Sequence, residues 1–108
     1  MSTGEQSVGF CESTARRTIE LIGGKWSMLV LWELLQDERR YADLQRRVIG
    51  ISQKVLSGKL RKLVDAGLVD REVTPAVPPQ VTYRITTEGR SLSPVFAELH
   101  RWGVEHAR

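Results

Sequence analysis

Basic and hydroxyl side chains share one side of a helix that the sequence predicts over residues 53–66. At about 3.6 residues per turn, three leucines fall on one stripe: Leu56, Leu60 and Leu63. The opposite side carries short polar and cationic residues: Lys54, Ser57, Gly58 and Arg61. One face of this helix can bury in a core, while the other suits the major groove of DNA.

The positive charge of the chain is concentrated around this helix. The 108 residues include 16 basic and 13 acidic ones, for a net charge of +3. Between Glu38 and Lys62, eight basic residues face only Glu38 and Asp43, which gives +6: Arg39, Arg40, Arg46, Arg47, Lys54, Lys59, Arg61 and Lys62. Such a patch attracts polyphosphate through counterion release. A basic run alone fits a solvated helical face better, but its coincidence with the two-sided helix favours DNA.

A shorter helix is predicted just before the basic one. It covers residues 42–48, with Leu44 and Val48 facing inward, and residues 49–51 form a turn. Ser52 is a good N-cap for the next helix, and Gly67 suits its C-terminal end. The pair is a helix-turn-helix. Residues 39–41 form either a brief strand or the start of the shorter helix.

Two strands follow, over residues 68–74 and 81–86. In the second, Val81, Tyr83 and Ile85 alternate with polar residues, which is the period of a strand. The residues between the strands include Pro75, Pro78 and Pro79, so the connection is a stiff loop and not a tight turn. This hairpin would act as a wing beside the helix-turn-helix.

Three more helices complete the pattern. The first begins at Cys11 and ends at Gly23-Gly24, and the second, over residues 25–36, is apolar nearly all round. The last covers residues 88–106, with Thr86 or Thr87 as its cap and a kink at Pro94. The predicted fold class is α+β, mostly α, in the order α-α-α-α-β-β-α. We expect a flexible arm over residues 1–10 and a single winged-helix domain over residues 11–108.

The terminal helices carry more apolar surface than one small domain can cover. The last helix presents a long stripe: Leu92, Val95, Phe96, Leu99 and Trp102. A two-fold dimer, in which terminal helices pack on those of a partner, would bury this stripe. The alternative is that both helices fold back on their own domain.

Other classes of protein lack support in the sequence. The two histidines, His100 and His106, lie in the last helix without a partner that would make a catalytic or metal site, and no phosphate-binding glycine loop is present. We therefore expect no enzyme activity, metal or cofactor. No run of about 20 apolar residues and no signal peptide is found. The single cysteine excludes an internal disulfide, which fits the cytoplasm.

Three segments, together with the lone Cys11, form a recognisable pattern: LIGGKWSMLVLWELL (21–35), RRYADLQRRVIGISQKVLSGKLRKLVDAGLVDREV (39–73) and VPPQVTYRITTEGRSLSPVFAELHRWG (77–103). From Cys11 to Trp102 the sequence thereby resembles the HxlR-type (MarR-like) family of bacterial winged-helix transcriptional regulators. The combination of IGGKW and the VPP wing, in this order, is close to diagnostic. Tyr41, Thr82 and Gly58 stand where the family often has phenylalanine, glutamate and a larger polar residue, and Gly58 bears on the DNA sequence that is read.

The resemblance implies a homodimer that binds an inverted-repeat operator in double-stranded DNA, usually as a repressor. The residues to which it assigns DNA contact are Ser52, Gln53, Lys54 and Ser57, with Arg39, Arg40 and Gln80 as further contacts. The chemistry agrees, because lysine suits guanine acceptors, glutamine suits adenine, and arginine suits phosphate. Winged helices also serve as protein–protein interaction modules, but that class would not explain the local charge of +6.

Cys11 is a candidate redox site. Free cysteines are often small buried apolar residues without reactivity. The predicted position at a helix N-terminus favours the thiolate, and Arg16 and Arg17 lie nearby, although Glu12 opposes them. Some members of the resembled family sense oxidants or electrophiles through a thiol here. We expect Cys11 to react with such effectors.

Overall fold

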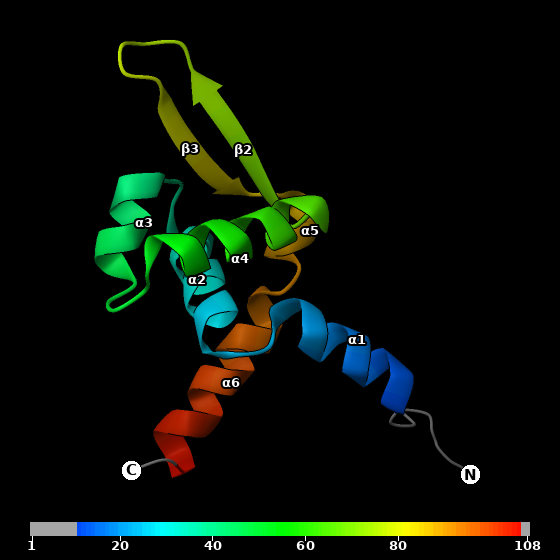
Figure 1. Ribbon diagram of the computed structural model, residues 1–108. Helices are drawn as coiled ribbons and strands as arrows, with labels where there is room; N and C mark the ends of the chain where they lie inside the picture. Colours follow the sequence, from blue (N-terminus) through cyan, green and yellow to red (C-terminus); the bar gives the residue numbers. More distant parts are fainter. Residues whose placement is uncertain (1–10, 107–108) are drawn as a thin grey trace, which may run out of the picture.

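The computed structural model describes residues 11–106, so the arm predicted over residues 1–10 lies outside the described part. The elements of that part follow one another along the chain: α1 (Glu12–Ile22), α2 (Lys25–Gln36), β1 (Arg39–Arg40), α3 (Tyr41–Arg47), α4 (Gln53–Asp65), β2 (Val69–Thr74), β3 (Gln80–Ile85), α5 (Thr87–Arg90) and α6 (Ser93–His106). In Figure 1 the β2–β3 hairpin projects from one side of the helices, while α1 and α6 extend on the other side. The predicted winged helix-turn-helix with added terminal helices is confirmed.

The core forms where α2 meets the helix-turn-helix. On α2, Val30, Leu31 and Leu34 are buried, and they join one cluster with Leu44 of α3 and the leucine stripe of α4. Each buried aliphatic side chain contributes roughly 1.5–3 kcal/mol. The opposite side of α2 is open to solvent at Leu29 and Trp32, so this helix is less completely buried than its sequence predicts.

The turn between α3 and α4 is fixed by buried and capping residues. Val48 and Ile51 are buried on either side of Gly50, whose φ of 89° is a conformation that favours glycine. Ser52 caps α4 by accepting a hydrogen bond from the Val55 backbone N–H at 3.1 Å. Gly67 follows α4 with a φ of 79°, which confirms its predicted place.

The sheet has three antiparallel strands in the order β1-β3-β2. Tyr83 of β3 lies between Arg39 of β1 and Arg71 of β2. Because side chains alternate along a strand, these three residues share the sheet face that turns toward the helices. Arg40, which pairs with Thr82, belongs to the opposite face. The sequence predicted either a brief strand or the start of a helix at residues 39–41, and both are present: the two-residue strand β1 is followed directly by α3.

The single final helix predicted over residues 88–106 is wrong. Thr86 does cap a helix, accepting a hydrogen bond from the Gly89 N–H at 3.0 Å, but this helix, α5, ends at Arg90. A separate helix, α6, begins at Ser93, so Pro94 lies in its first turn, where the missing N–H breaks no helical hydrogen bond. The proline starts a helix and does not kink one.

The apolar stripe of α6 divides between two environments. Phe96 is only 4% exposed and belongs to the core of its own chain, so it offers little surface to a partner. Leu92 packs against the same core, whereas Val95, Leu99 and Trp102 stay exposed. The residues available to a partner are thus fewer than the sequence predicts.

The outer parts of both terminal helices extend away from the body of the molecule (Figure 1). Ile22 is the one buried residue of α1, and Ile19 on the same helix is 64% exposed. The Cα radius of gyration is 16.2 Å, above the value of about 13 Å for a compact domain of this size. Much apolar surface of α1 and α6 is therefore uncovered in the single chain.

Two glycines provide a matched test of this packing. A Cβ at Gly89 would collide with the Leu68 carbonyl oxygen and lie 2.8 Å from Cδ1 of Ile85, whereas one at Gly58 would meet nothing within 4 Å. Gly89→Ala should lower the free energy of unfolding by more than about 2 kcal/mol. Gly58→Ala should raise it by about 1 kcal/mol, since alanine favours a helix interior. Urea unfolding at one protein concentration measures both, and equal effects would contradict the described packing of α5.

Candidate nucleic-acid interface

The exposed side of α4 is cationic and has a gap at its middle. Lys54, Ser57, Gly58 and Arg61 are exposed, whereas the leucine stripe on the other side is at most 1% exposed. Because Gly58 has no side chain, a shallow hollow of about 410 Å³ lies beside it, lined by Lys54, Val55, Gly58, Lys59 and Lys62. A surface of this shape lets the helix approach a base edge or a phosphate closely.

Ser52 can donate a hydrogen bond to DNA while it caps α4. Its Oγ accepts from the Val55 N–H, so the hydroxyl hydrogen remains available. A phosphate oxygen accepts hydrogen bonds and never donates them, and Ser52 lies where the positive end of the helix dipole also favours an anion. A phosphate contact therefore suits Ser52 better than a contact to a base amino group.

Ser57 is oriented differently, because Tyr41 holds its hydroxyl. The Tyr41 hydroxyl donates to the Gln53 carbonyl oxygen at 3.1 Å and lies 2.9 Å from Ser57 Oγ. When the single tyrosine proton is directed to Gln53, Ser57 must donate to Tyr41 and can then only accept further hydrogen bonds. In that arrangement Ser57 suits the amino group of adenine or cytosine and not a phosphate.

Arg39 is engaged inside the fold and does not extend toward DNA. Its side chain is 16% exposed, and its Nη2 lies 3.5 Å from Glu33 Oε1. Arg47 Nε donates to the same carboxylate oxygen at 2.6 Å, which raises the pKa of Arg47. The predicted phosphate contact of Arg39 is therefore corrected: the register of β1 turns this side chain inward, where it joins the sheet to α2.

Other basic residues of the segment also have partners. Arg46 pairs with Asp43 one turn away, and the Lys62 ammonium group donates to the carbonyl oxygen of Glu20 in α1. Within residues 11–106, no ion pair is found for Lys62 or for the remaining four: Arg40, Lys54, Lys59 and Arg61. The cationic surface is smaller than the sequence predicts, and most of what remains lies on α4.

The structure does not bring Arg40 and Gln80 together with Lys54. Arg40 is exposed on the sheet face that turns away from the helices, and Gln80 starts β3 opposite Thr74, at the far end of the hairpin. These two residues could contact only backbone that flanks the segment of DNA under α4. Ser52, Gln53, Lys54 and Ser57, in contrast, cluster at one end of a single helix.

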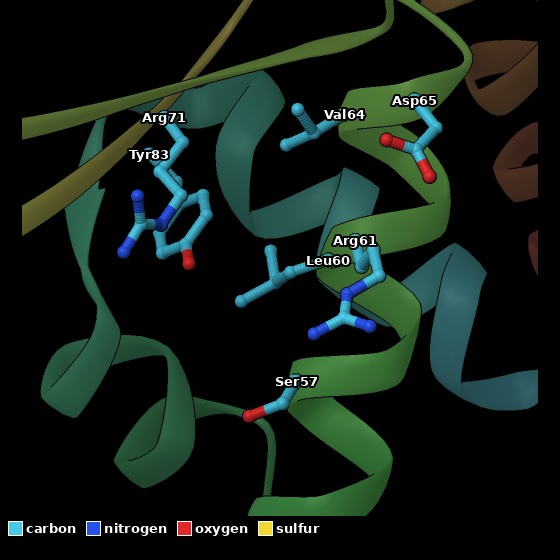
Figure 2. Close-up of a pocket in the computed structure, with 7 residues that line it drawn as sticks. All are labelled: Ser57, Leu60, Arg61, Val64, Asp65, Arg71 and Tyr83. Carbon is cyan, nitrogen blue, oxygen red and sulfur yellow. The ribbon is translucent and has the colours of Figure 1, made fainter.

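Two further residues of this region, Arg61 and Arg71, were not among the predicted contacts. They line a cavity of about 390 Å³ between α4 and the hairpin, shown in Figure 2. Arg61 stood on the cationic side of the helical wheel. Arg71 follows only from the hairpin register, which places it opposite Tyr83 on the face toward α4. Pairing the two predicted strands residue by residue would have placed Arg71 opposite Tyr83.

Cys11 is exposed at the N-cap position of α1. Its Sγ lies 3.4 Å from Ser13 Oγ, and the hydrogen bond from that hydroxyl is the main cause that lowers the pKa of the Cys11 thiol to about 7. The Thr14 hydroxyl and backbone N–H act in the same direction. Arg16, invoked from the sequence, pairs with Glu12 instead. The lowered pKa favours the thiolate, the reactive form, near neutral pH.

Across residues 11–106, no group of three or more histidine, cysteine or acidic side chains is arranged to hold a metal ion. The same stretch contains no helix that is both long and apolar enough to cross a membrane.

Comparison with known proteins gives one consistent result. The profile of the HxlR-like helix-turn-helix family matches residues 21–108. YkvN of Bacillus subtilis (strain 168), described as an uncharacterized HTH-type transcriptional regulator, is 44% identical over 90 residues, which are 83% of this chain and 76% of YkvN.

Two similar solved structures come from regulators studied for their redox state. The redox regulator HypR in its oxidized form superposes with a TM-score of 0.80 at 33% identity, over 86% of this chain and 96% of HypR. The reduced form of the transcriptional regulator YodB from B. subtilis gives a TM-score of 0.76 at 29% identity, over 88% of this chain and 92% of YodB.

The cluster on α4 predicts that some residues contact bases and so depend on the DNA sequence, whereas others contact only the phosphate backbone. Lys54→Ala and Gln53→Ala should weaken binding to a selected operator by about 1–3 kcal/mol per lost base contact, and random-sequence DNA much less. Arg40→Ala, the matched control, should weaken binding to both DNAs alike. Fluorescence anisotropy with both duplexes at one salt concentration measures the difference. An equal loss on both duplexes for Lys54→Ala would mean that this lysine contacts phosphate.

Proposed function

The chain belongs to the HxlR-like helix-turn-helix family of DNA-binding transcriptional regulators, and we propose that it acts as a homodimeric, oxidant-responsive repressor. The observation that carries the DNA-binding part is the exposed cationic face of α4, which lies within the segment matched by the family profile. The dimer and the response to oxidants rest on further features of α1 and α6, and the repressor role follows from the dimer. A cytoplasmic location and the lack of enzyme activity belong to the same proposal.

Uncovered apolar surface on the terminal helices supports the homodimer. Val95, Leu99 and Trp102 of α6 are exposed, Trp102 at 59%, and so is Ile19 of α1. Lone exposed apolar residues are common, but three on one stripe of a projecting helix, as on α6, mark an interaction surface. Since α1 and α6 lie away from the hairpin in Figure 1, a partner bound there would leave α4 free for DNA.

A small hollow gives this surface a shape that a partner can fill. It has a volume of about 200 Å³ and lies between α2 and α6, with an apolar lining: Met28, Leu29, Trp32, Phe96, Leu99 and His100. The rings of Trp32 and His100 are stacked beside it, with centroids 6.3 Å apart. We propose that side chains of the partner's terminal helices enter this hollow.

A two-fold dimer accounts for an inverted-repeat operator. Two α4 helices related by a two-fold axis can enter two major-groove sites about one helical turn, or a multiple of it, apart. A dimer bound over a promoter would occlude it, which is the basis of the repressor proposal. The competing class is a protein–protein interaction module. DNA fragments selected with the purified protein, followed by binding in rising salt, separate the two classes, because a module should bind weakly at every salt concentration.

Charge on the α6 surface should separate the chains. Leu99→Glu and Trp102→Glu should each give a folded monomer, because a buried carboxylate without a partner opposes association. Val77→Glu is the matched control, since Val77 is fully exposed in the wing loop and should leave the dimer intact. Light scattering at micromolar concentration measures the mass. A monomeric wild-type chain under these conditions, with circular dichroism typical of a folded protein, would refute the homodimer.

The proposed response to oxidants begins with the Cys11 thiolate. Diamide removes two electrons from two thiolates, which join in a disulfide, while its azo group takes up these electrons and two protons and becomes a hydrazine. The chain has one cysteine, so the second thiol comes from another subunit or a small thiol. With a quinone, the thiolate adds to a ring carbon, and the ring takes up a proton and becomes a hydroquinone. Either change in α1 would shift the dimer surface and the spacing of the α4 helices.

The lowered pKa of Cys11 predicts a pH profile of its reactivity. In the folded protein, the rate of alkylation by iodoacetamide should rise with a midpoint near pH 7, because the thiolate forms at the lowered pKa. In urea the midpoint should move up to about 8.5. Ser13→Ala should raise the midpoint of the folded protein, and Thr18→Ala, which removes another hydroxyl of α1, should not. Mass spectrometry follows the alkylation.

The effect of Cys11 oxidation on DNA binding is measured by comparing the wild type with Cys11→Ser. Diamide should change the operator affinity of the wild type and leave that of Cys11→Ser unchanged. Two results would contradict the redox proposal: the same midpoint pH of alkylation in folded and unfolded protein, or a wild-type operator affinity that diamide does not alter. Neither would contradict the proposed DNA binding.

A further inference from the structure

The cavity between α4 and the hairpin brings two arginines from different elements to one space. It has a volume of about 390 Å³. Figure 2 shows the Arg61 guanidinium of α4 in front of the helix, and the Arg71 guanidinium of β2 beside the Tyr83 ring, across the space between helix and hairpin from Arg61. Ser57 of α4 lines the end of the cavity nearer the start of the helix.

Neither arginine is neutralised by a carboxylate. In residues 11–106, no ion pair involves Arg61 or Arg71. Arg84, on the other face of the same sheet, pairs with Glu72 at 2.9 Å and with Glu38 at 3.3 Å. The hairpin thus neutralises an arginine on one face and leaves one unneutralised on the face toward α4. Two like charges around one cavity favour the binding of an anion between them.

The cavity is both cationic and apolar, which narrows the chemistry of the anion. Its wall toward α4 includes Leu60 and Val64, and one carboxylate, Asp65, lies at the end remote from Ser57. An anion is therefore favoured beside Arg61, at the end of the cavity away from Asp65, and the Ser57 hydroxyl can donate to it only when Tyr41 donates to Ser57. A phosphodiester flanked by deoxyriboses suits this arrangement, because its oxygens accept hydrogen bonds from guanidinium groups while sugar carbons pack on the half-buried Val64.

The position of the cavity relative to Lys54 indicates where such a group would come from. Ser57 lines the cavity and also lies three residues after Lys54 on the exposed side of α4. The cavity thus continues the surface that carries the predicted base contacts. A strand of DNA whose major groove receives Lys54 and Gln53 would next pass between α4 and the hairpin.

We propose that Arg61 and Arg71 together hold one phosphodiester of the DNA backbone in this cavity, a contact that rests on the DNA-binding function proposed above. The two guanidinium groups donate to its oxygens from opposite sides, one from the helix and one from the wing. Because the two arginines belong to different elements, the shared phosphate fixes how deeply α4 enters the groove relative to the hairpin. Arg61 and Arg71 position the helix, and they carry no base sequence information.

Salt dependence tests whether the two arginines share a phosphate. The variants are Arg61→Gln, Arg71→Gln and the double variant, with Arg90→Gln as a control of equal charge change at the hollow beside Arg84. On a short random-sequence duplex, each single variant should bind about tenfold more weakly, and Arg90→Gln by less than about twofold. A phosphate held by both arginines predicts that the salt slope of the double variant falls by about 0.9, whereas two separate phosphates predict about 1.8.

Asp65→Asn gives an independent test that needs no loss of a contact. Removing the carboxylate from the cavity should tighten binding to the same duplex severalfold, while the variant keeps the stability of the wild type in urea. The shared phosphate would be overturned if both single arginine variants kept the affinity and salt slope of the wild type. It would also be overturned if the salt slope of the double variant fell by about 1.8. A wild-type chain that binds no DNA at low salt would instead overturn the proposed function itself.

Discussion

Burial of the leucine stripe of α4 against α2 is the constraint on which the rest of the structure depends. Leu56, Leu60 and Leu63 are almost fully buried, and together they set the rotation of α4 about its own axis. Rotating the helix to expose them would cost several kcal/mol at roughly 1.5–3 kcal/mol for each side chain. The same rotation decides that Lys54 and Arg61 face outward. The chemistry of the exposed side therefore follows from packing on the buried side.

Ion pairs within the fold then decide which cations are available to a ligand. Glu33 holds Arg39 and Arg47 between α2, β1 and α3, and Lys62 joins α4 to α1. Arg39 and Arg47 share the negative charge of Glu33 and so contribute less to the field that DNA meets, whereas Lys62 keeps its full charge. Placement on the inner or outer face, and not the number of basic residues, defines the candidate interface.

Much of the fold could be predicted because its signals are local. The helix-turn-helix, the cap at Ser52, the glycine after α4 and the proline-containing wing loop each depend on a few adjacent residues. The break before α6 could not be predicted with the same rules, because a proline is compatible with both a kink and a first turn. Here the buried Gly89 packs α5 onto the sheet and starts α6 in a new direction.

Residues of the site that depend on contacts between distant segments were harder to predict. Arg39 looked like an exposed cation, but the register of β1 with β3 turns it toward Glu33. Arg71 looked like an ordinary strand residue until it was paired with Tyr83 and faced α4. Phe96 shared a helical stripe with exposed neighbours, and only the packing of α6 on the core separates them.

The central claim is that one face of the chain binds DNA while the opposite helices join two chains. Hydroxyl-radical footprinting on a selected operator, combined with the mass of the complex in solution, tests both parts at once. The account predicts two protected segments related by a two-fold axis, with centres about one helical turn or a multiple apart, and two chains per duplex. A single protected segment with one chain per duplex at full occupancy would contradict it.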